Sequence, residues 1–199
     1  MLGLPIATEV YKALPKKAIF AKFELKPAQR DHFDEDVAKL AIVNIISPTT
    51  VPVLSKGEYI ECIYIIEVLL KKRSFDSKNI QMLSKLIPQK IVFVLHYEDY
   101  IRLAINHTKY IYSDWFEASE VKLILLGLNL DRVWENIVIS VGNIEVEEGS
   151  TLEKQIQLDD SKAKLLKQIT LLEAKARTEK QPRKKLKYFE DIKKLKSQI

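Results

Sequence analysis

The residues best suited to chemistry in this sequence are an aspartate followed by a Glu-x-Lys triplet. Asp114 lies in a strand-like segment, and Glu120 and Lys122 follow it. Nucleases of the restriction type use an acidic residue and a Glu-x-Lys triplet to hold Mg²⁺ beside a lysine. Glu-x-Lys triplets also occur at residues 24–26 and 173–175, about as often as chance predicts. A divergent magnesium-dependent nuclease is therefore a hypothesis that rests on three residues.

Other catalytic or ligand-binding patterns are absent from the sequence. The three histidines, His32, His96 and His107, have no HxxxH or CxxC neighbours, so we expect no metal site. The five glycines form no GxGxxG, GxxxxGK[ST] or GxSxG motif, so we expect no cofactor. Cys62 is the single cysteine, which excludes an internal disulfide and fits a reducing cytosol. The chain is therefore more typical of a non-catalytic protein than of an enzyme.

Positive charge is concentrated in the last fifty residues. Residues 150–199 hold fourteen Lys or Arg and seven Asp or Glu, a net charge of +7. The whole chain carries +5, so residues 1–149 sum to −2. The segment has no glycine and a single proline, which favours helices. We therefore divide the chain into a globular domain, residues 1–149, and a charged helical arm, residues 150–199.

A basic cluster surrounds Pro182 in the arm, and it consists of Lys180, Arg183, Lys184, Lys185 and Lys187. Such a cluster binds the phosphates of nucleic acid or an acidic protein surface. The alternative interpretation is an ordinary solvated helix face. No aromatic residue is interleaved with these cations, so the pattern does not predict base stacking.

Apolar residues recur along the arm at helical spacing. Leu165, Ile169, Leu172 and Ala176 are spaced +4, +3, +4, and Tyr188, Ile192, Leu195 and Ile199 repeat this spacing. Each stripe lasts about two heptads, which is too short for an independent coiled coil. The stripes therefore need the globular domain, a second copy or a protein partner to cover them. The residues expected to dock a partner are Leu158, Leu165, Ile169, Leu172, Tyr188, Ile192 and Leu195.

Pro182 interrupts the helical pattern of the arm. A proline inside a helix removes a hydrogen bond and costs about 3 kcal/mol. Two interpretations follow: Pro182 begins the second helix of an antiparallel hairpin, or one long helix kinks there. The absence of glycine at 178–181 argues mildly against a sharp turn, and we favour a break that lets the two halves pack separately.

Residues 1–149 alternate between helical and strand-like patterns. Pro15 and Pro27 each suit the start of a helix, and Gly142 with Asn143 suits the end of one. In the run after Gly57, Ile60, Cys62, Tyr64, Ile66 and Val68 form an apolar set that should face the core, while the alternate residues should be half exposed. Helices are expected after Pro15, after Pro27, from Asp76 or Ser77 to Pro88, and from Asn129 or Asp131 to Gly142. Strands are expected at 40–47, in 58–70, at 91–95, at 100–105 and across 108–116.

These elements predict an α+β fold with a mixed sheet of about five strands, flanking helices and a long helical arm broken near Pro182. The helix between the second and third predicted strands has the length of a crossover, which favours a parallel pair there. No apolar run reaches the roughly 20 residues that cross a bilayer, and no signal peptide is evident. We therefore expect a cytoplasmic location and no membrane partner.

Several stretches, taken in order, are similar to an uncharacterised bacterial family, domain-of-unknown-function family 4391. They are LPIATEVYKALPKKAIF, NIISPTTVPV, MLSKLIPQKIVFVLHYEDYIRLAINHTK, LEKQIQ and EKQPRKK. Pro182 departs from the more continuous helical tail of that family. The resemblance implies an accessory role, because such families are often encoded beside helicases and DNA methyltransferases of restriction or anti-phage loci.

The hypothesis that follows is a non-catalytic accessory or scaffold subunit of a DNA-modification or anti-phage defence complex. Its arm would dock a helicase or methyltransferase subunit, or a second copy of the chain. The alternatives are a nucleic-acid-binding protein that uses residues 180–187 and the magnesium-dependent nuclease.

Overall fold

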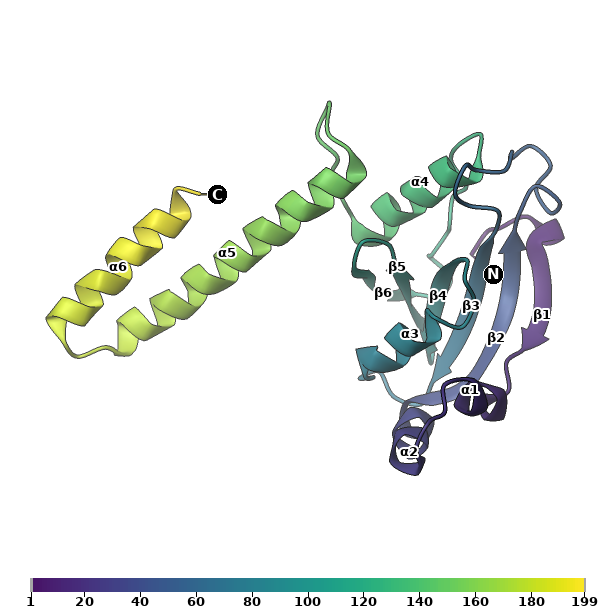
Figure 1. Cartoon of the computed structure of the whole chain (residues 1–199), viewed down its shortest axis with the longest axis horizontal. Coiled ribbons are helices and arrows are strands. Elements are labelled where there is room, and N and C mark those ends of the chain that lie inside the picture. Colours follow the sequence, from purple (N-terminus) through teal and green to yellow (C-terminus); the bar gives the residue numbers. More distant parts are fainter. Residues whose placement is uncertain (1, 199) are drawn as a thin grey trace. The chain divides into compact units, whose positions relative to one another are not determined.

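Six strands form one mixed sheet in the computed structural model, which describes residues 2–198 (Figure 1). Their order in the sheet is their order in the chain. β3 and β4 are parallel and every other neighbouring pair is antiparallel, which confirms the predicted mixed sheet and α+β class. The strands are β1 (Glu9–Ala13), β2 (Val37–Ile46), β3 (Ile63–Leu70), β4 (Lys90–Tyr97), β5 (Tyr100–Asn106) and β6 (Tyr110–Glu117).

The edge strand β1 is the strand that the sequence pattern did not predict. It follows a short 3₁₀ helix, η1 (Ile6–Thr8), and four of its five residues are exposed. A short exposed edge strand shows no alternation of apolar and polar residues, because few of its side chains pack against the core. Asn44 of β2 donates a buried hydrogen bond of 2.9 Å to the Thr8 hydroxyl, which anchors this segment to the sheet.

Three helices cover one face of the sheet: α1 (Lys16–Lys22), α2 (Pro27–Asp36) and α3 (Ser77–Leu83). Their buried side chains include Ile19, Phe33 and Ile80, which pack in one cluster with Ile66 of β3 and Phe93 of β4. Pro27 occupies the first turn of α2, and the Asp76 side chain caps α3 by accepting from the Lys78 amide at 2.9 Å. These are the local signals from which the helices were predicted.

The helix α4 (Leu130–Gly142) covers the opposite face. Ile65, Val92, Ile105 and Ile111 are cross-strand partners and therefore share one face of the sheet. A Cβ atom added at Gly142 would lie 3.1 Å from Ile111 Cγ2, so the end of α4 lies against this face. The Asn129 side chain caps the start of α4, and Asn143, in the left-handed conformation with φ of 46°, ends it.

Because helices lie on both faces, β3 is buried on both sides. Ile63 and Ile65 are 0% exposed, although the alternation in this run predicted that they would be half exposed. That prediction is wrong because it assumed one solvated face, as in many antiparallel sheets. Regular pairing also begins only at Ile63, so residues 58–62 precede the strand.

A buried carboxylate joins the helices on the first face. Asp36, at the end of α2, is 1% exposed. Its Oδ2 accepts from the Asp76 amide at 2.7 Å and from the Asn79 side chain at 2.9 Å, and its Oδ1 lies 2.9 Å from Lys72 Nζ. Burial raises the pKa of Asp36, but the Asp76 amide and the Lys72 ammonium lower it more, so the net pKa is below its ordinary value. Asp36 is therefore held ionised as a structural link between α2 and α3.

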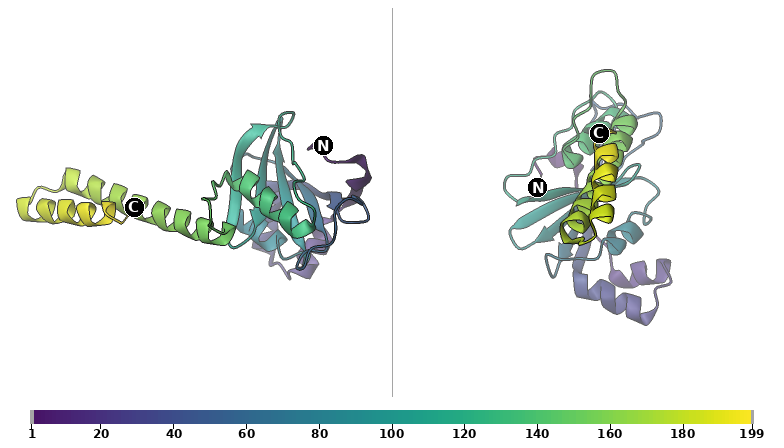
Figure 2. Two further views of the ribbon diagram at one scale, coloured as in Figure 1. Left: turned by 90° about the horizontal axis from the view of Figure 1, so that it is seen from above. Right: turned by 90° about the vertical axis from the view of Figure 1, so that its left-hand side faces the viewer.

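The internal contacts divide the chain into two compact units, residues 1–144 and residues 145–199, called here the body and the hairpin unit. The hairpin unit contains α5 (Leu152–Thr178) and α6 (Pro182–Lys196). Figure 1 and the left view of Figure 2 show these two helices running side by side in opposite directions. Among residues 2–198, no helix combines the length and the apolar character needed to cross a membrane.

Candidate nucleic-acid interface

The two apolar stripes of the arm are covered by each other. Ile169 and Ala176 of α5 and Ile192 of α6 are buried, at 4%, 1% and 6% exposure, where the two helices pack. Leu165, Leu172, Tyr188 and Leu195 are half buried beside them. Ile199, the last member of the second stripe, lies outside the described residues. Docking of a partner through these residues stays a prediction, and it would require the helices to separate.

Leu158 belongs to the same stripe but lies beyond the reach of α6. The α5 helix has 27 residues and α6 has 15, so α6 covers only the C-terminal half of α5. Leu158 is 41% exposed. Four further large apolar side chains of α5 and α6 are exposed, and they are Leu166, Leu171, Leu186 and Phe189.

The turn between the helices is short and begins α6 at Pro182. α5 ends at Thr178, and the Gln181 amide donates to the Glu179 carboxylate at 2.9 Å within the turn. Pro182 occupies the first turn of α6, where its missing N–H group costs nothing. Of the two interpretations of Pro182, the structure adopts the antiparallel hairpin. The favoured break with separately packed halves is wrong, because α5 and α6 bury their apolar residues against each other. An ion pair of 3.0 Å between Lys196 and Glu173 also joins the two helices.

The five predicted cations all lie at this turn, and the segment 180–187 is called here the hairpin tip. Lys180, Arg183, Lys184, Lys185 and Lys187 are all exposed. The tip contains no Asp or Glu. Within residues 2–198, none of the five side chains makes an ion pair, whereas Lys164 and Lys196 elsewhere in the unit do. The tip therefore presents five cations without a carboxylate partner.

The position of these cations is unfavourable for α6 itself. Arg183, Lys184 and Lys185 occupy its first turn, which has no acidic residue and no side-chain cap. The N-terminus of a helix carries partial positive charge, so each cation there costs a few tenths of a kcal/mol to about 1 kcal/mol. In α5 the preference is obeyed, with Glu153 in the first turn and Lys175 and Arg177 in the last. The cations of the tip therefore do not serve the stability of their own helix.

Successive helical residues differ by about 100° around the axis, so Arg183, Lys184 and Lys185 point in three directions from the start of α6. Lys187 returns to the side of Arg183, four residues earlier. Such a fan of cations suits the phosphates of a nucleic-acid backbone, which surround an inserted element. It does not suit base recognition, because no aromatic or amide side chain accompanies it within the tip beyond Gln181.

The predicted nuclease residues lie on the edge strand β6 and in the segment after it. No hydrogen bond or ion pair joins any two of them. Asp114 is exposed on β6, Glu120 lies in the turn after β6, and Lys122 lies in the extended segment beyond it. The Lys122 side chain runs alongside Gly3. Across residues 2–198, no three His, Cys, Asp or Glu side chains form a group able to hold a metal ion. Nothing in this geometry favours a magnesium site.

One polar pair within the sheet was not predicted. His96 of β4 and Glu67 of β3 lie 3.0 Å apart, Nδ1 to Oε1, and both are about one-fifth exposed. Their spacing in the sequence carries no signal, because it depends on the parallel register of β3 and β4, which places His96 opposite Leu69. In the antiparallel pair of β4 and β5, His96 lies opposite Ile101. His107, beyond the end of β5, contacts Trp134, whose Nε1 donates to His107 Nδ1 at 3.2 Å.

Comparison with known proteins identifies a family but no activity. A family model described as Domain of unknown function (DUF4391) matches residues 2–199 of the chain. No curated protein and no solved structure matches the chain. The function is therefore argued from the geometry of the hairpin tip.

Proposed function

The chain belongs to the DUF4391 family, and from this premise we propose that it is a nucleic-acid-binding accessory protein whose hairpin tip contacts backbone phosphates. The observation that carries the proposal is the set of five exposed cations at the tip without carboxylate partners. A DNA-modification or defence complex is the setting that the family resemblance implies. The proposed role is non-catalytic.

The proposed contact is electrostatic and independent of base sequence. Each phosphate neutralised releases condensed counterions, so affinity falls linearly with the logarithm of salt concentration. Five cations set an upper limit of about −4.5 on this slope for duplex DNA. The hairpin unit, residues 145–199, carries a net charge of +4 and the body, residues 1–144, only +1, so the tip is the favoured point of contact.

The test is fluorescence anisotropy of the full chain with labelled duplex and single-stranded DNA of unrelated sequences over a salt series. We expect similar affinities for unrelated sequences and a slope between about −2 and −4.5 on duplex DNA. The double substitution Lys184→Glu and Lys185→Glu should weaken binding at least about tenfold at low salt and reduce the slope by about 2. Acidic residues suit the start of a helix, so this variant should not unfold α6.

The matched control reverses two lysines at the other end of the same helix. Lys193 and Lys194 lie in the last turn of α6, so Lys193→Glu with Lys194→Glu changes the net charge by the same amount. If both double variants lose equal affinity, net charge rather than the tip determines binding. If the unchanged chain does not bind DNA at low salt, the proposal is wrong.

A second candidate function is protein docking through the apolar side chains that the hairpin leaves exposed. Leu186 and Phe189 are three residues apart on α6, and each is more than half exposed. Residues three apart share a helix face, so the pair forms an apolar patch beside the tip. The partners to test are a helicase or DNA methyltransferase subunit and a second copy of the chain.

Docking is tested by co-purification of the full chain with such subunits and by sedimentation of the chain alone. Leu186→Ser with Phe189→Ser should abolish a specific association, while Leu158→Ser, on the N-terminal half of α5, should not. An association that survives the first pair of substitutions would exclude this patch.

A further inference from the structure

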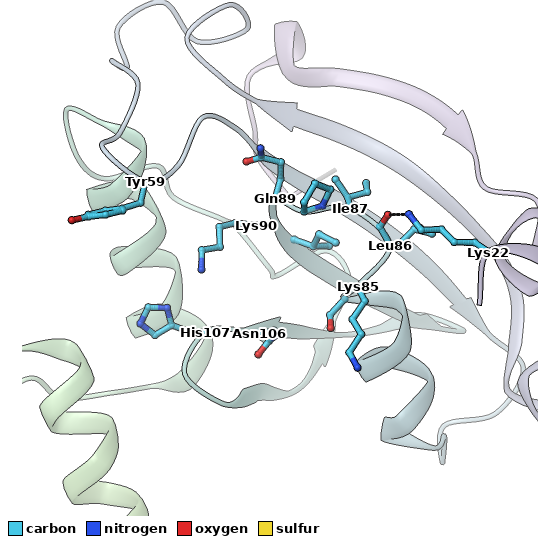
Figure 3. A pocket seen from close by; sticks show the side chains of 12 residues that line it. Lys22, Tyr59, Lys85, Leu86, Ile87, Gln89, Lys90, Asn106 and His107 are labelled. Carbon is cyan, nitrogen blue, oxygen red and sulfur yellow. Dashed lines mark hydrogen bonds between the residues drawn. The ribbon is translucent and has the colours of Figure 1, made fainter. Parts of the chain in front are cut away.

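A hollow of about 510 Å³ opens in the body where α3 leads into β4 (Figure 3). It is far in sequence from the hairpin tip, and neither the nuclease hypothesis nor the docking hypothesis uses it. Its walls come from α1, the segment before β3, the loop between α3 and β4, and the end of β5. Its polar lining residues are Lys22, Tyr59, Ser84, Lys85, Gln89, Lys90, Asn106 and His107.

The lining has three lysines and no Asp or Glu. Lys22, Lys85 and Lys90 contribute three positive charges, whereas the other residues of the body, residues 1–144, sum to −2. Within residues 2–198, none of the three makes an ion pair, whereas Lys16, Lys56 and Lys72 in the same body do. The hollow is therefore a local concentration of positive charge in an otherwise acidic body.

Two of the three lysines are held in place without being neutralised. Lys22 Nζ donates to the Leu86 carbonyl at the wall of the hollow. Lys90 Nζ lies 5.4 Å from the centre of the Trp134 ring, a cation–π contact that orients the ammonium but leaves its charge. In Figure 3 the Lys90 side chain extends toward the end of β5, where Asn106 and His107 lie.

The size and the remaining lining indicate what carries the anion. A cavity of about 510 Å³ lies in the range of small-molecule sites and exceeds what a bare phosphate fills. Leu86, Ile87 and Ile91 supply apolar walls, and the Tyr59 ring is 82% exposed at the edge of the hollow. Lysine ammonium groups bind phosphate as point charges, which compensates for the missing glycine-rich loop.

We propose that this hollow binds a small phosphorylated organic ligand, whose phosphate is attracted by the lysines that line the hollow, Lys22, Lys85 and Lys90. The apolar walls and Tyr59 contact the organic part. This site is separate from the hairpin tip, and its ligand does not depend on nucleic-acid binding there.

The test is isothermal titration of the full chain at low salt with AMP, ATP and inorganic phosphate, with adenosine as the phosphate-free probe. We expect AMP and ATP to bind and adenosine not to bind. Lys85→Ala and Lys22→Ala should each weaken binding at least about tenfold, equivalent to one lost charge-assisted contact. Lys39→Ala, an exposed lysine of β2 outside the hollow, is the matched control and should change nothing.

A terminal phosphate of a nucleic acid carries the same chemistry, so a second arm separates the two sources. Single strands with and without a 5′-phosphate are titrated into the Lys184→Glu, Lys185→Glu variant, which removes the contribution of the tip. A preference for the 5′-phosphate with no binding of AMP assigns the hollow to strand ends and overturns the free-ligand proposal. Equal binding of AMP and adenosine, no binding of AMP and ATP at millimolar concentration, or binding unchanged by the lysine substitutions also overturns it.

Discussion

The body and the hairpin unit bury their apolar residues in different ways. In the body, β3 has helices on both faces of the sheet and its isoleucines are fully buried. In the hairpin unit, Ile169, Ala176 and Ile192 are the residues buried where α5 and α6 pack, and most other side chains of the two helices are exposed. A two-helix hairpin has a single line of contact and no second layer. The body is therefore expected to be far more stable than the hairpin unit.

The two regions also place their charges differently. The body neutralises buried charge within itself, as Asp36 does with Lys72 and the Asp76 amide. The hairpin tip leaves five cations without partners. Charge that is internally satisfied serves the fold, and charge that is exposed and unmatched is available to a ligand. This difference is why we assign structural roles to the acids of the body and a binding role to the tip.

The largest expected effect is in the body, at Asp36. Asp36→Ala leaves the Asp76 amide and the Asn79 side chain without their acceptor, so the body should lose about 3 kcal/mol of unfolding free energy. Trp115 and Trp134, the two tryptophans of the chain, both lie in the body, so denaturation followed by tryptophan fluorescence measures this loss. Asp34→Ala, on the same helix as Asp36, breaks a partly exposed ion pair with Lys16 of α1 and should cost less than about 1 kcal/mol.

The next effect is in the hairpin unit, at Ile169. Ile169→Ala removes one of the few buried side chains of the helix pair and should destabilise it by about 2–3 kcal/mol. Helical circular dichroism should fall while the tryptophan transition of the body stays unchanged. Leu171→Ala, at an exposed position of the same helix, should have little effect. A shifted tryptophan transition in the Ile169 variant would show that the two units unfold together and would break the comparison.

A smaller effect is expected from pH in the body. The pKa of Asp76 is lowered by the Lys78 amide and by His32, and that of Asp36 is lowered despite its burial. Carboxyl groups with lowered pKa stabilise the folded state fully above their unfolded value of 3.8, and this stability is lost as the pH falls through the folded pKa. Tryptophan-monitored stability should therefore decline below about pH 3.8. The decline should be shallower in Asp36→Ala, and an equal decline would exclude Asp36 as its source.

The smallest effect is expected at Pro182. The first helical position tolerates alanine, so Pro182→Ala should cost less than about 1 kcal/mol and leave the hairpin closed. Spin labels at Gln168→Cys and Lys193→Cys, in a Cys62→Ser background, report the separation of α5 and α6. A longer distance in Pro182→Ala would show that the proline, rather than the packing of Ile169 and Ile192, determines the turn.

Local signals predicted most of the body, and non-local contacts account for what they missed. Pro27, Asp76, Asn129 and Asn143 act at helix ends, where the sequence itself supplies the partner. The burial of Ile63 and Ile65 depends on α4, which follows β3 by more than fifty residues, so alternation alone predicted it wrongly. The Glu67–His96 pair and the lysine hollow depend in the same way on segments that are distant in the chain.

In the hairpin unit, periodicity identified the residues but not the surface that covers them. The +4, +3, +4 spacing of Ile169 and Ile192 is the same whether the stripes meet each other or a partner. The short turn determines that the stripes meet each other. Only three residues separate Thr178 from Pro182, so α6 folds back and its stripe packs on the stripe of α5. The cations of the tip were identified from composition, but their lack of partners is visible only in three dimensions.

The strand order of the sheet has a consequence for how the protein is made. Since β1 to β6 occupy the sheet in the order of synthesis, each strand that leaves the ribosome finds its partner already at the growing edge. No strand has to insert between two strands that are already paired. Neighbouring strands are consecutive in the chain, so each pairing closes a shorter loop and costs less entropy. The hairpin unit follows β6 in the chain and contributes no strand to this sheet, so the sheet can be complete while α5 and α6 are still being translated.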